Sequence, residues 1–197
     1  MQMNNLDSLP KKKILSLFMT CGFPTLNQSK KIFNEILSHQ PDIIEFGLPF
    51  SDPMADGPII QEANKLALRS KLSTQQSLDL IKYLSKSKNN TSFVIMCYLN
   101  TVRKFGLNKF IKNIKSIVDG IIIVDLPYEE EGLIKSYPEW ASHLKKAYAG
   151  WRTYFLTNDL TMPKHMRLKP TKKTPLFNGA LDCRLFEINI VAGSNRS

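Results

Sequence analysis

The strongest guide to the fold of this chain is a regular alternation of short apolar runs with segments of helical periodicity. Apolar runs of strand length cover residues 14–19, 42–46, 93–98 and 120–124. Helical periodicity fills the intervals, over residues 27–38, 61–69 and 74–86 and in a stripe at 110–118. Nearly continuous apolar strands joined by helices are typical of parallel strands covered on both faces. The pattern predicts an α/β fold, either an open doubly wound sheet or a closed barrel.

The alternation weakens after about Gly132. Residues 136–151 contain a proline and scattered aromatic side chains, and residues 162–179 are basic and interrupted by prolines. We predict no further β-α step there. Such a composition is typical of a poorly ordered extension, and a basic contact with nucleic acid is the alternative. The chain is therefore divided into residues 1–132, which carry the regular pattern, and a divergent basic tail at 133–197.

The net charge of +10 is unevenly distributed along the 197 residues. Residues 1–132 hold 16 Lys and Arg against 13 Asp and Glu, whereas residues 133–197 hold 11 against 4. A phosphorylated substrate, a polyanion or solubility alone would fit this balance, so charge does not choose a function. No apolar run approaches the ~20 residues that span a bilayer, and we expect no membrane association. Cys21, Cys97 and Cys183 are widely spaced, which predicts buried, reduced thiols.

Acidic residues follow the second predicted strand. Alternation along residues 42–47 places Glu45 and Ile43 on one side and Ile44 and Phe46 on the other, so Glu45 is expected in a core layer. A partly dehydrated carboxylate of this kind can hold or deliver a proton. Asp52 and Asp56 then lie among prolines, which exclude helix and strand and predict a shaped loop. Parallel α/β proteins place ligands at this end of a strand.

Other roles fit the same carboxylates. Glu45 could be a structural acid paired with a basic side chain. Glu45, Asp52 and Asp56 together could supply oxygen ligands to magnesium, but no histidine or phosphate-binding motif accompanies them, and we predict no metal site. Two acids in unlike surroundings suit divided acid and base roles, which is the interpretation that we prefer.

Four segments resemble the alpha subunit of tryptophan synthase. They are FMTCGFP at 18–24, DIIEFGLPFSDPMADGPIIQEA at 42–63, IMCYLN at 95–100 and DGIIIVDLPYEEE at 119–131. The segments occur in family order with family-like spacing over residues 13–132. The resemblance implies an eight-stranded (β/α) TIM barrel, of which this chain would supply the first four to five β/α units.

The resemblance also implies a reaction and its residues. The family cleaves indole-3-glycerol phosphate to indole and glyceraldehyde 3-phosphate in tryptophan biosynthesis, without a cofactor in this subunit. By motif position, Glu45 corresponds to the proton-transferring acid and base, and Asp56 to the carboxylate that stabilises the indole nitrogen. Phe18, Tyr98 and Ile122 match positions lining the indole pocket, although ordinary core packing explains each of them as well.

The resemblance further implies a partner. In the family, the segment with Pro49 and Asp52 and the loop after Asn100 face a pyridoxal-phosphate-dependent beta subunit in an α2β2 assembly. We expect this partner and the small-molecule substrate, and no nucleic acid. Cytoplasm is the expected compartment, and the Lys-, Asn- and Ile-rich sequence would also suit a plastid stroma.

This chain departs from the family in several places. Barrels of this kind run to ~250 residues and bind the substrate phosphate with loops after strands seven and eight. Neither the glycine-rich phosphate motifs nor the tyrosine-bearing loop is found beyond Gly132, which predicts a frameshifted or truncated reading frame. An inactive remnant that at most binds a beta subunit is therefore the alternative function. Lys71 replaces a helix-ending glycine, at a cost of about 1 kcal/mol if the left-handed geometry persists.

Overall fold

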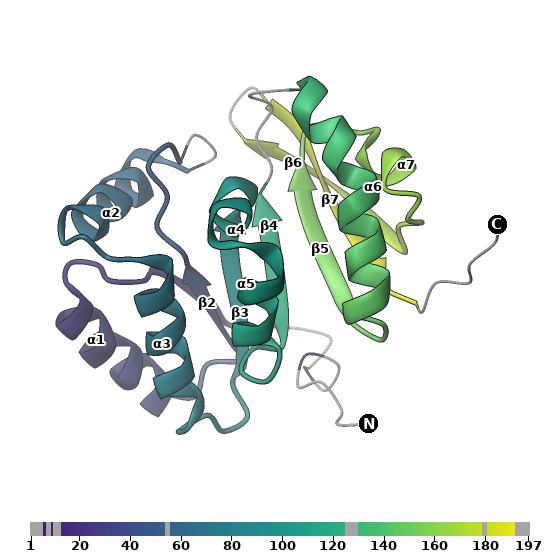
Figure 1. Ribbon diagram of the computed structural model, residues 1–197. Helices are drawn as coiled ribbons and strands as arrows, with labels where there is room; N and C mark the ends of the chain where they lie inside the picture. The colour runs from purple at the N-terminus through teal and green to yellow at the C-terminus, as the bar shows by residue number, and fades with distance from the viewer. Residues whose placement is uncertain are drawn as a thin grey trace. The chain divides into compact units, whose positions relative to one another are not determined.

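The computed structural model of this chain describes residues 6, 9, 13–53, 56–124, 130–178 and 181–191. The chain divides into two compact units, Met1–Ile121 and Ile122–Ser197. Figure 1 labels their helices and strands in chain order.

The first unit is built on three parallel strands. β1 is Ser16–Thr20, β2 is Ile43–Gly47 and β3 is Ser92–Tyr98, and β2 pairs with both of the others. The register places Glu45 of β2 beside Phe18 of β1 and Val94 of β3. β4, Gly120–Val124, begins in this unit and crosses its boundary. These strands match the predicted apolar runs to within about two residues, and the α/β class is confirmed.

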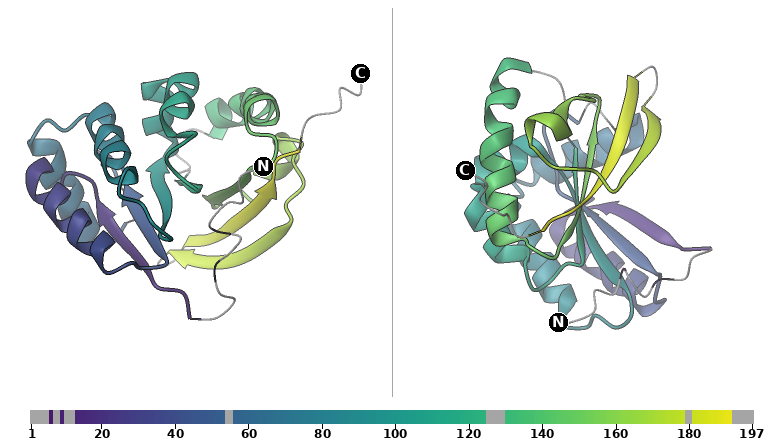
Figure 2. Two further views of the ribbon diagram at one scale, coloured as in Figure 1. Left: turned by 90° about the horizontal axis from the view of Figure 1, so that it is seen from below. Right: turned by 90° about the vertical axis from the view of Figure 1, so that its right-hand side faces the viewer.

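Five helices connect and follow these strands. They are α1 (Leu26–Ser38), α2 (Pro58–Arg69), α3 (Thr74–Ser85), α4 (Leu99–Phe105) and α5 (Leu107–Ile114). Figure 2 shows the helices of this unit on one face of its strands, and no helix among its described residues lies on the other face. Side-chain caps fix two of the helix starts: Thr25 accepts from the Gln28 N–H, and Ser73 and Gln76 form a capping box.

The core of the first unit lies between β2, β3 and the helices. Phe46 is fully buried between Phe33 of α1 and Phe93 of β3, with ring centroids 4.8 and 4.9 Å away. Ile44 and Phe46 therefore face the helices, and Glu45 lies on the opposite face, as the alternation predicted. Burial of these aromatic rings stabilises this unit.

The second unit has a different strand arrangement. It contains α6 (Glu130–Ala147), β5 (Arg152–Thr157), α7 (Met162–His165), β6 (Lys172–Asn178) and β7 (Leu181–Asn189). β5 pairs in parallel with β4 on one edge and antiparallel with β7 on the other, and β7 pairs antiparallel with β6. Strand β7 thus separates β5 from β6.

No further β-α step was predicted after residue 132, and this is wrong, because α6 is followed by β5, which pairs in parallel with β4. The prolines and lysines of this part of the chain obscured the strand alternation of apolar residues. Phe155 of β5 and Phe186 of β7 are buried and lie beside each other across the strand pair. Pro175 is accommodated within β6, and Pro138 within α6. A frameshifted origin of residues 133–197 stays a prediction. Within the described ranges, none of the helices combines the length and apolarity needed to cross a bilayer.

Candidate functional site

Glu45 stands on the helix-free face of β2. It is half-buried, not enclosed in the layer of Ile44 and Phe46, because that layer belongs to the opposite face. The Ser16 hydroxyl of β1 donates a hydrogen bond to Glu45 Oε1. No basic side chain in the described ranges forms an ion pair with Glu45.

Phe18 lies against the same segment. It is half-buried, and its ring covers Gly47: a Cβ added to Gly47 would lie 2.5 Å from Phe18 Cζ. A side chain at this position would therefore have to displace the Phe18 ring. The parallel register brings Phe18 beside Glu45, so two of the residues predicted from the sequence share one face of the strands.

Asp56 occupies the loop after β2 and is held by two side chains. Its Oδ2 accepts a hydrogen bond from Asn64 Nδ2 at 3.3 Å, and its carboxylate accepts another from the Tyr98 hydroxyl. Burial of the carboxyl group raises the pKa of Asp56 above its ordinary value, and the bonds from Tyr98 and Asn64 partly offset that rise. The structure therefore brings together Asp56 and Tyr98, which the sequence assigned separately.

The loop that follows β2 is anchored at several points. The Asp56 N–H donates to the Pro53 carbonyl at 3.0 Å, and Gln61 Nε2 donates to the Asp56 carbonyl at 2.9 Å. The Phe50 ring stacks on Tyr98 with centroids 4.8 Å apart and planes inclined at 21°. These contacts confirm a shaped loop at the carboxyl end of a parallel strand. Residues 54 and 55 lie outside the described ranges.

Sequence reasoning missed Ser16, Phe50 and Asn64. Of these, Asn64 carried a usable signal, because it interrupts the apolar face that Ala63 and Ala67 define on α2. A buried amide at such a position requires hydrogen-bond partners. Phe50 carried no comparable signal, since its contact with Tyr98 depends on the path of the loop.

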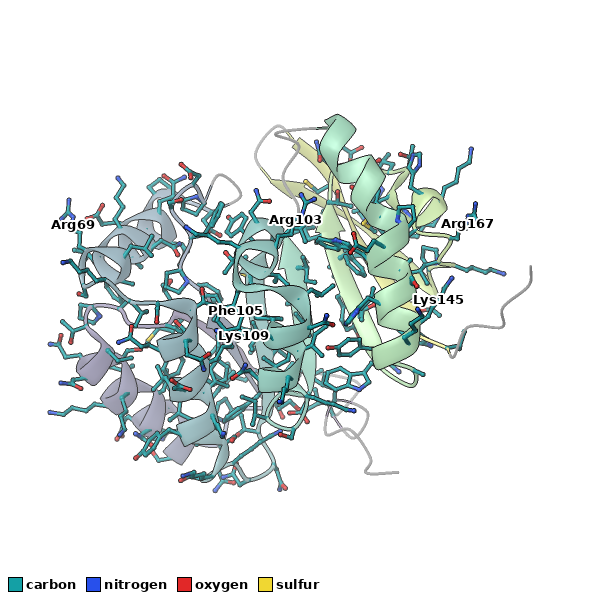
Figure 3. The ribbon with its side chains drawn as sticks, viewed as in Figure 1. Arg69, Arg103, Phe105, Lys109, Lys145 and Arg167 are labelled. Carbon is teal, nitrogen blue, oxygen red and sulfur yellow. The ribbon has the colours of Figure 1, made fainter. Side chains whose placement is uncertain are left out.

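A cavity of about 720 Å³ opens beside this loop within the first unit. Pro49 and Asn100 both line it, so the structure brings together two of the three residues predicted to face a partner. Asp52 is exposed and accepts from the Ser51 hydroxyl at 2.7 Å. Phe105 of α4 and Lys109 of α5 also line the cavity, with Lys109 Nζ 4.4 Å from the centre of the Phe105 ring; both are labelled in Figure 3.

Ile122 belongs to the second unit. It is half-buried in β4 and pairs with Tyr154 of β5. Its assignment to the indole pocket stays a prediction.

The three cysteines are buried and unpaired, as predicted. Burial raises the pKa of Cys21, and it raises that of Cys97 to about 12, so both remain neutral thiols at physiological pH. In the described part of the chain, no group of three or more His, Cys, Asp or Glu side chains is arranged to hold a metal ion.

Parallel strands with helices between them, and the carboxylates of Glu45 on β2 and Asp56 in the loop after it, define an α/β protein with a candidate acid-base site. Comparison with known sequences makes the assignment specific. The sequence model of the tryptophan synthase alpha chain family matches residues 5–141. The chain therefore belongs to the tryptophan synthase alpha chain family, and the resemblance of its four motifs is confirmed.

Individual relatives support this assignment. The tryptophan synthase alpha chain of Clostridium acetobutylicum is 43% identical over 125 residues, which are 63% of this chain and 47% of that protein. The alpha chain of Parabacteroides distasonis is 38% identical over 141 residues, covering 71% of this chain and 54% of the relative. This chain thus spans about half the length of the curated relatives that it matches.

Solved structures agree on the fold. A protein from Aquifex aeolicus aligns with a TM-score of 0.62 and 33% identity over 73% of this chain and 54% of its own. The alpha subunit of tryptophan synthase from Legionella pneumophila aligns with a TM-score of 0.60 and 30% identity over 77% and 57%. The predicted membership in the (β/α) barrel family is confirmed by these similarities.

Proposed function

We propose that this chain carries the lyase chemistry of the tryptophan synthase alpha chain, cleaving indole-3-glycerol phosphate to indole and glyceraldehyde 3-phosphate. The observation that carries the proposal is the setting of Asp56, a partly buried carboxylate held by Tyr98 and Asn64 at the carboxyl end of β2. Membership in the family and the position of Glu45 on the same segment support it.

The reaction needs two proton transfers and one stabilised cation. Protonation of the substituted indole ring carbon leaves positive charge on the ring nitrogen. The bond from that carbon to the glycerol side chain then breaks, and its electron pair returns to the ring. The adjacent glycerol hydroxyl loses its proton and becomes the aldehyde of glyceraldehyde 3-phosphate. The first proton is thus gained by the ring and the second is released from the hydroxyl.

The two carboxylates fit different parts of this sequence. Glu45, half-exposed on the helix-free face, can deliver one proton and accept the other. Asp56 in its ionised form stabilises the positive ring nitrogen, and Tyr98 and Asn64 fix its orientation. Phe18, Tyr98 and Ile122 would contact the indole ring. Cytoplasm is the proposed compartment.

We further propose that Pro49, Asp52 and Asn100 contact a beta subunit in an α2β2 assembly. The support is that Pro49 and Asn100 line one 720 Å³ cavity while Asp52 is exposed on the neighbouring loop. A second candidate function, a remnant that binds a beta subunit without catalysis, rests on the half-length coverage of the relatives.

Turnover by the purified full chain tests the first proposal. Release of indole from indole-3-glycerol phosphate should fall by roughly 10²–10⁴-fold in Glu45→Gln, because the proton donor and acceptor is lost. Asp56→Asn should reduce it by roughly 10²–10³-fold, because the developing cation loses its counter-charge.

The exposed Asp79→Asn serves as the matched control and should retain wild-type turnover. No indole from the wild-type chain, with or without an added beta subunit, would remove the lyase proposal. If the wild-type chain nevertheless co-purifies with that subunit, the remnant function replaces it.

A further inference from the structure

Asn64 is a buried amide at the centre of the loop contacts. It lies on α2 and is 4% exposed. Its neighbours on the buried face of the helix, Ala63 and Ala67, are apolar, so nothing in the local pattern of the helix calls for a polar side chain. Burying an amide costs free energy unless its hydrogen-bonding atoms are satisfied.

Those atoms are satisfied by two ends of the loop and by the helix itself. Asn64 Oδ1 accepts from the Phe50 backbone N–H at 3.1 Å, and Nδ2 donates to Asp56 Oδ2 at 3.3 Å and to the Ile60 carbonyl at 2.9 Å. The partners fix the orientation of the amide, because the Phe50 N–H can only donate and the Ile60 carbonyl can only accept.

These contacts close into a ring of interactions. Asn64 holds the backbone of Phe50, the Phe50 ring stacks on Tyr98, and the Tyr98 hydroxyl donates to Asp56. Asp56 returns to Asn64 through the 3.3 Å hydrogen bond. One amide therefore bonds the Asp56 carboxylate directly and holds the backbone of the residue whose ring stacks on Tyr98.

We propose that Asn64 is a positioning residue that orients the Asp56 carboxylate toward the substrate by tying both ends of the loop to α2. The catalytic meaning of this orientation rests on the proposed function, whereas the effect on Asp56 itself does not. A neutral donor facing the carboxylate favours its ionised form, the form that can stabilise a cation.

Titration of Asp56 by carbon-13 NMR in the labelled full chain tests the proposal. In Asn64→Leu the donor is lost, and the pKa of Asp56 should rise by about one unit, the size expected for one hydrogen bond to a charged group. In Asn64→Asp, which has nearly the same shape, repulsion between two carboxylates should also raise it.

Gln61→Leu is the matched control. Gln61 lies on the same helix and donates to the Asp56 backbone carbonyl rather than to its carboxylate, so the titration should not change. An unchanged Asp56 titration in a folded Asn64→Leu variant would overturn the proposal. Unfolding of both Asn64 variants while Gln61→Leu stays folded would also overturn it, since the role would then be structural.

The titration needs no turnover and is therefore independent of the lyase proposal. If turnover is observed, Asn64→Asp should lower kcat more than it changes KM, and the acid limb of its pH profile should move to higher pH. If the acid limb of the Asn64→Asp profile stayed at the wild-type pH, the positioning role would be contradicted even if the protein were active.

Discussion

At the residue scale, Asp56 shows how a loop sets the chemistry of a carboxyl group. The group is partly removed from water, which disfavours its charge, while Tyr98 and Asn64 donate to the charged form. Burial is the larger effect, so the folded chain binds the Asp56 proton more tightly than the unfolded chain does. Ionisation of Asp56 therefore weakens the folded state.

This imbalance has a measurable consequence for stability. Because its pKa is higher in the folded chain, Asp56 favours folding most at low pH, and that contribution is lost as pH rises from about 3.9, the ordinary Asp value, through the raised value. Urea midpoints of Asp56→Asn relative to wild type should therefore increase with pH across this window. The exposed Asp79→Asn should show no such trend, and a constant difference for Asp56→Asn would contradict the argument.

The residues of the site differ in how far sequence could reveal them. Alternation along β2 correctly placed Glu45 opposite Phe46, but it could not show that the helices of the described part of this unit lie on the face of Phe46. The contact between Asp56 and Tyr98 depends on the path of the loop, and local sequence does not encode that path. Asn64 was detectable in principle, because a polar residue on an apolar helix face requires a partner.

At the scale of elements, the end of α2 confirms an expectation from the sequence. The helix ends at Arg69, and Lys71 has a φ of 54°, the left-handed conformation that glycine adopts at least cost. Lys71→Gly should therefore increase the free energy of unfolding by about 1 kcal/mol, measured by urea denaturation. Lys82→Gly, within α3, should decrease it by a similar amount. A decrease in both variants would contradict the assigned geometry of Lys71.

Helices with caps and strong periodicity were the easiest elements to predict. The short α4 escaped prediction because it follows β3 directly and has no side-chain cap. It is separated from α5 by Gly106, whose φ of 93° requires glycine. β6 and β7 were not predicted because lysines and prolines conceal their alternation of apolar residues. These strands are stabilised by their antiparallel pairing rather than by local sequence preference.

At the scale of the whole molecule, the division into two units predicts local rather than uniform loss of stability. Phe46→Ala removes a fully buried ring between Phe33 and Phe93 and should cost the first unit ~3–5 kcal/mol. Hydrogen exchange followed by mass spectrometry should then show that, relative to wild type, this variant accelerates exchange more in peptides of residues 16–114 than in those of 152–189.

Phe186→Ala should give the reverse pattern, because that ring is buried in the second unit. Ile59→Ala, at an 84% exposed position, should alter neither set of peptides. Equal acceleration across the chain in both phenylalanine variants would show one cooperative unit instead of two.

The antiparallel strand β7 also matters to anyone who wishes to engineer this protein. Since β4 and β7 occupy the two edges of β5, a further parallel strand has no free edge of β5 on which to dock. A graft that restores a full-length relative's second half should therefore replace the hairpin of β6 and β7, with its junction before Lys172. A fusion made after Asn189 would retain the strand that blocks continuation.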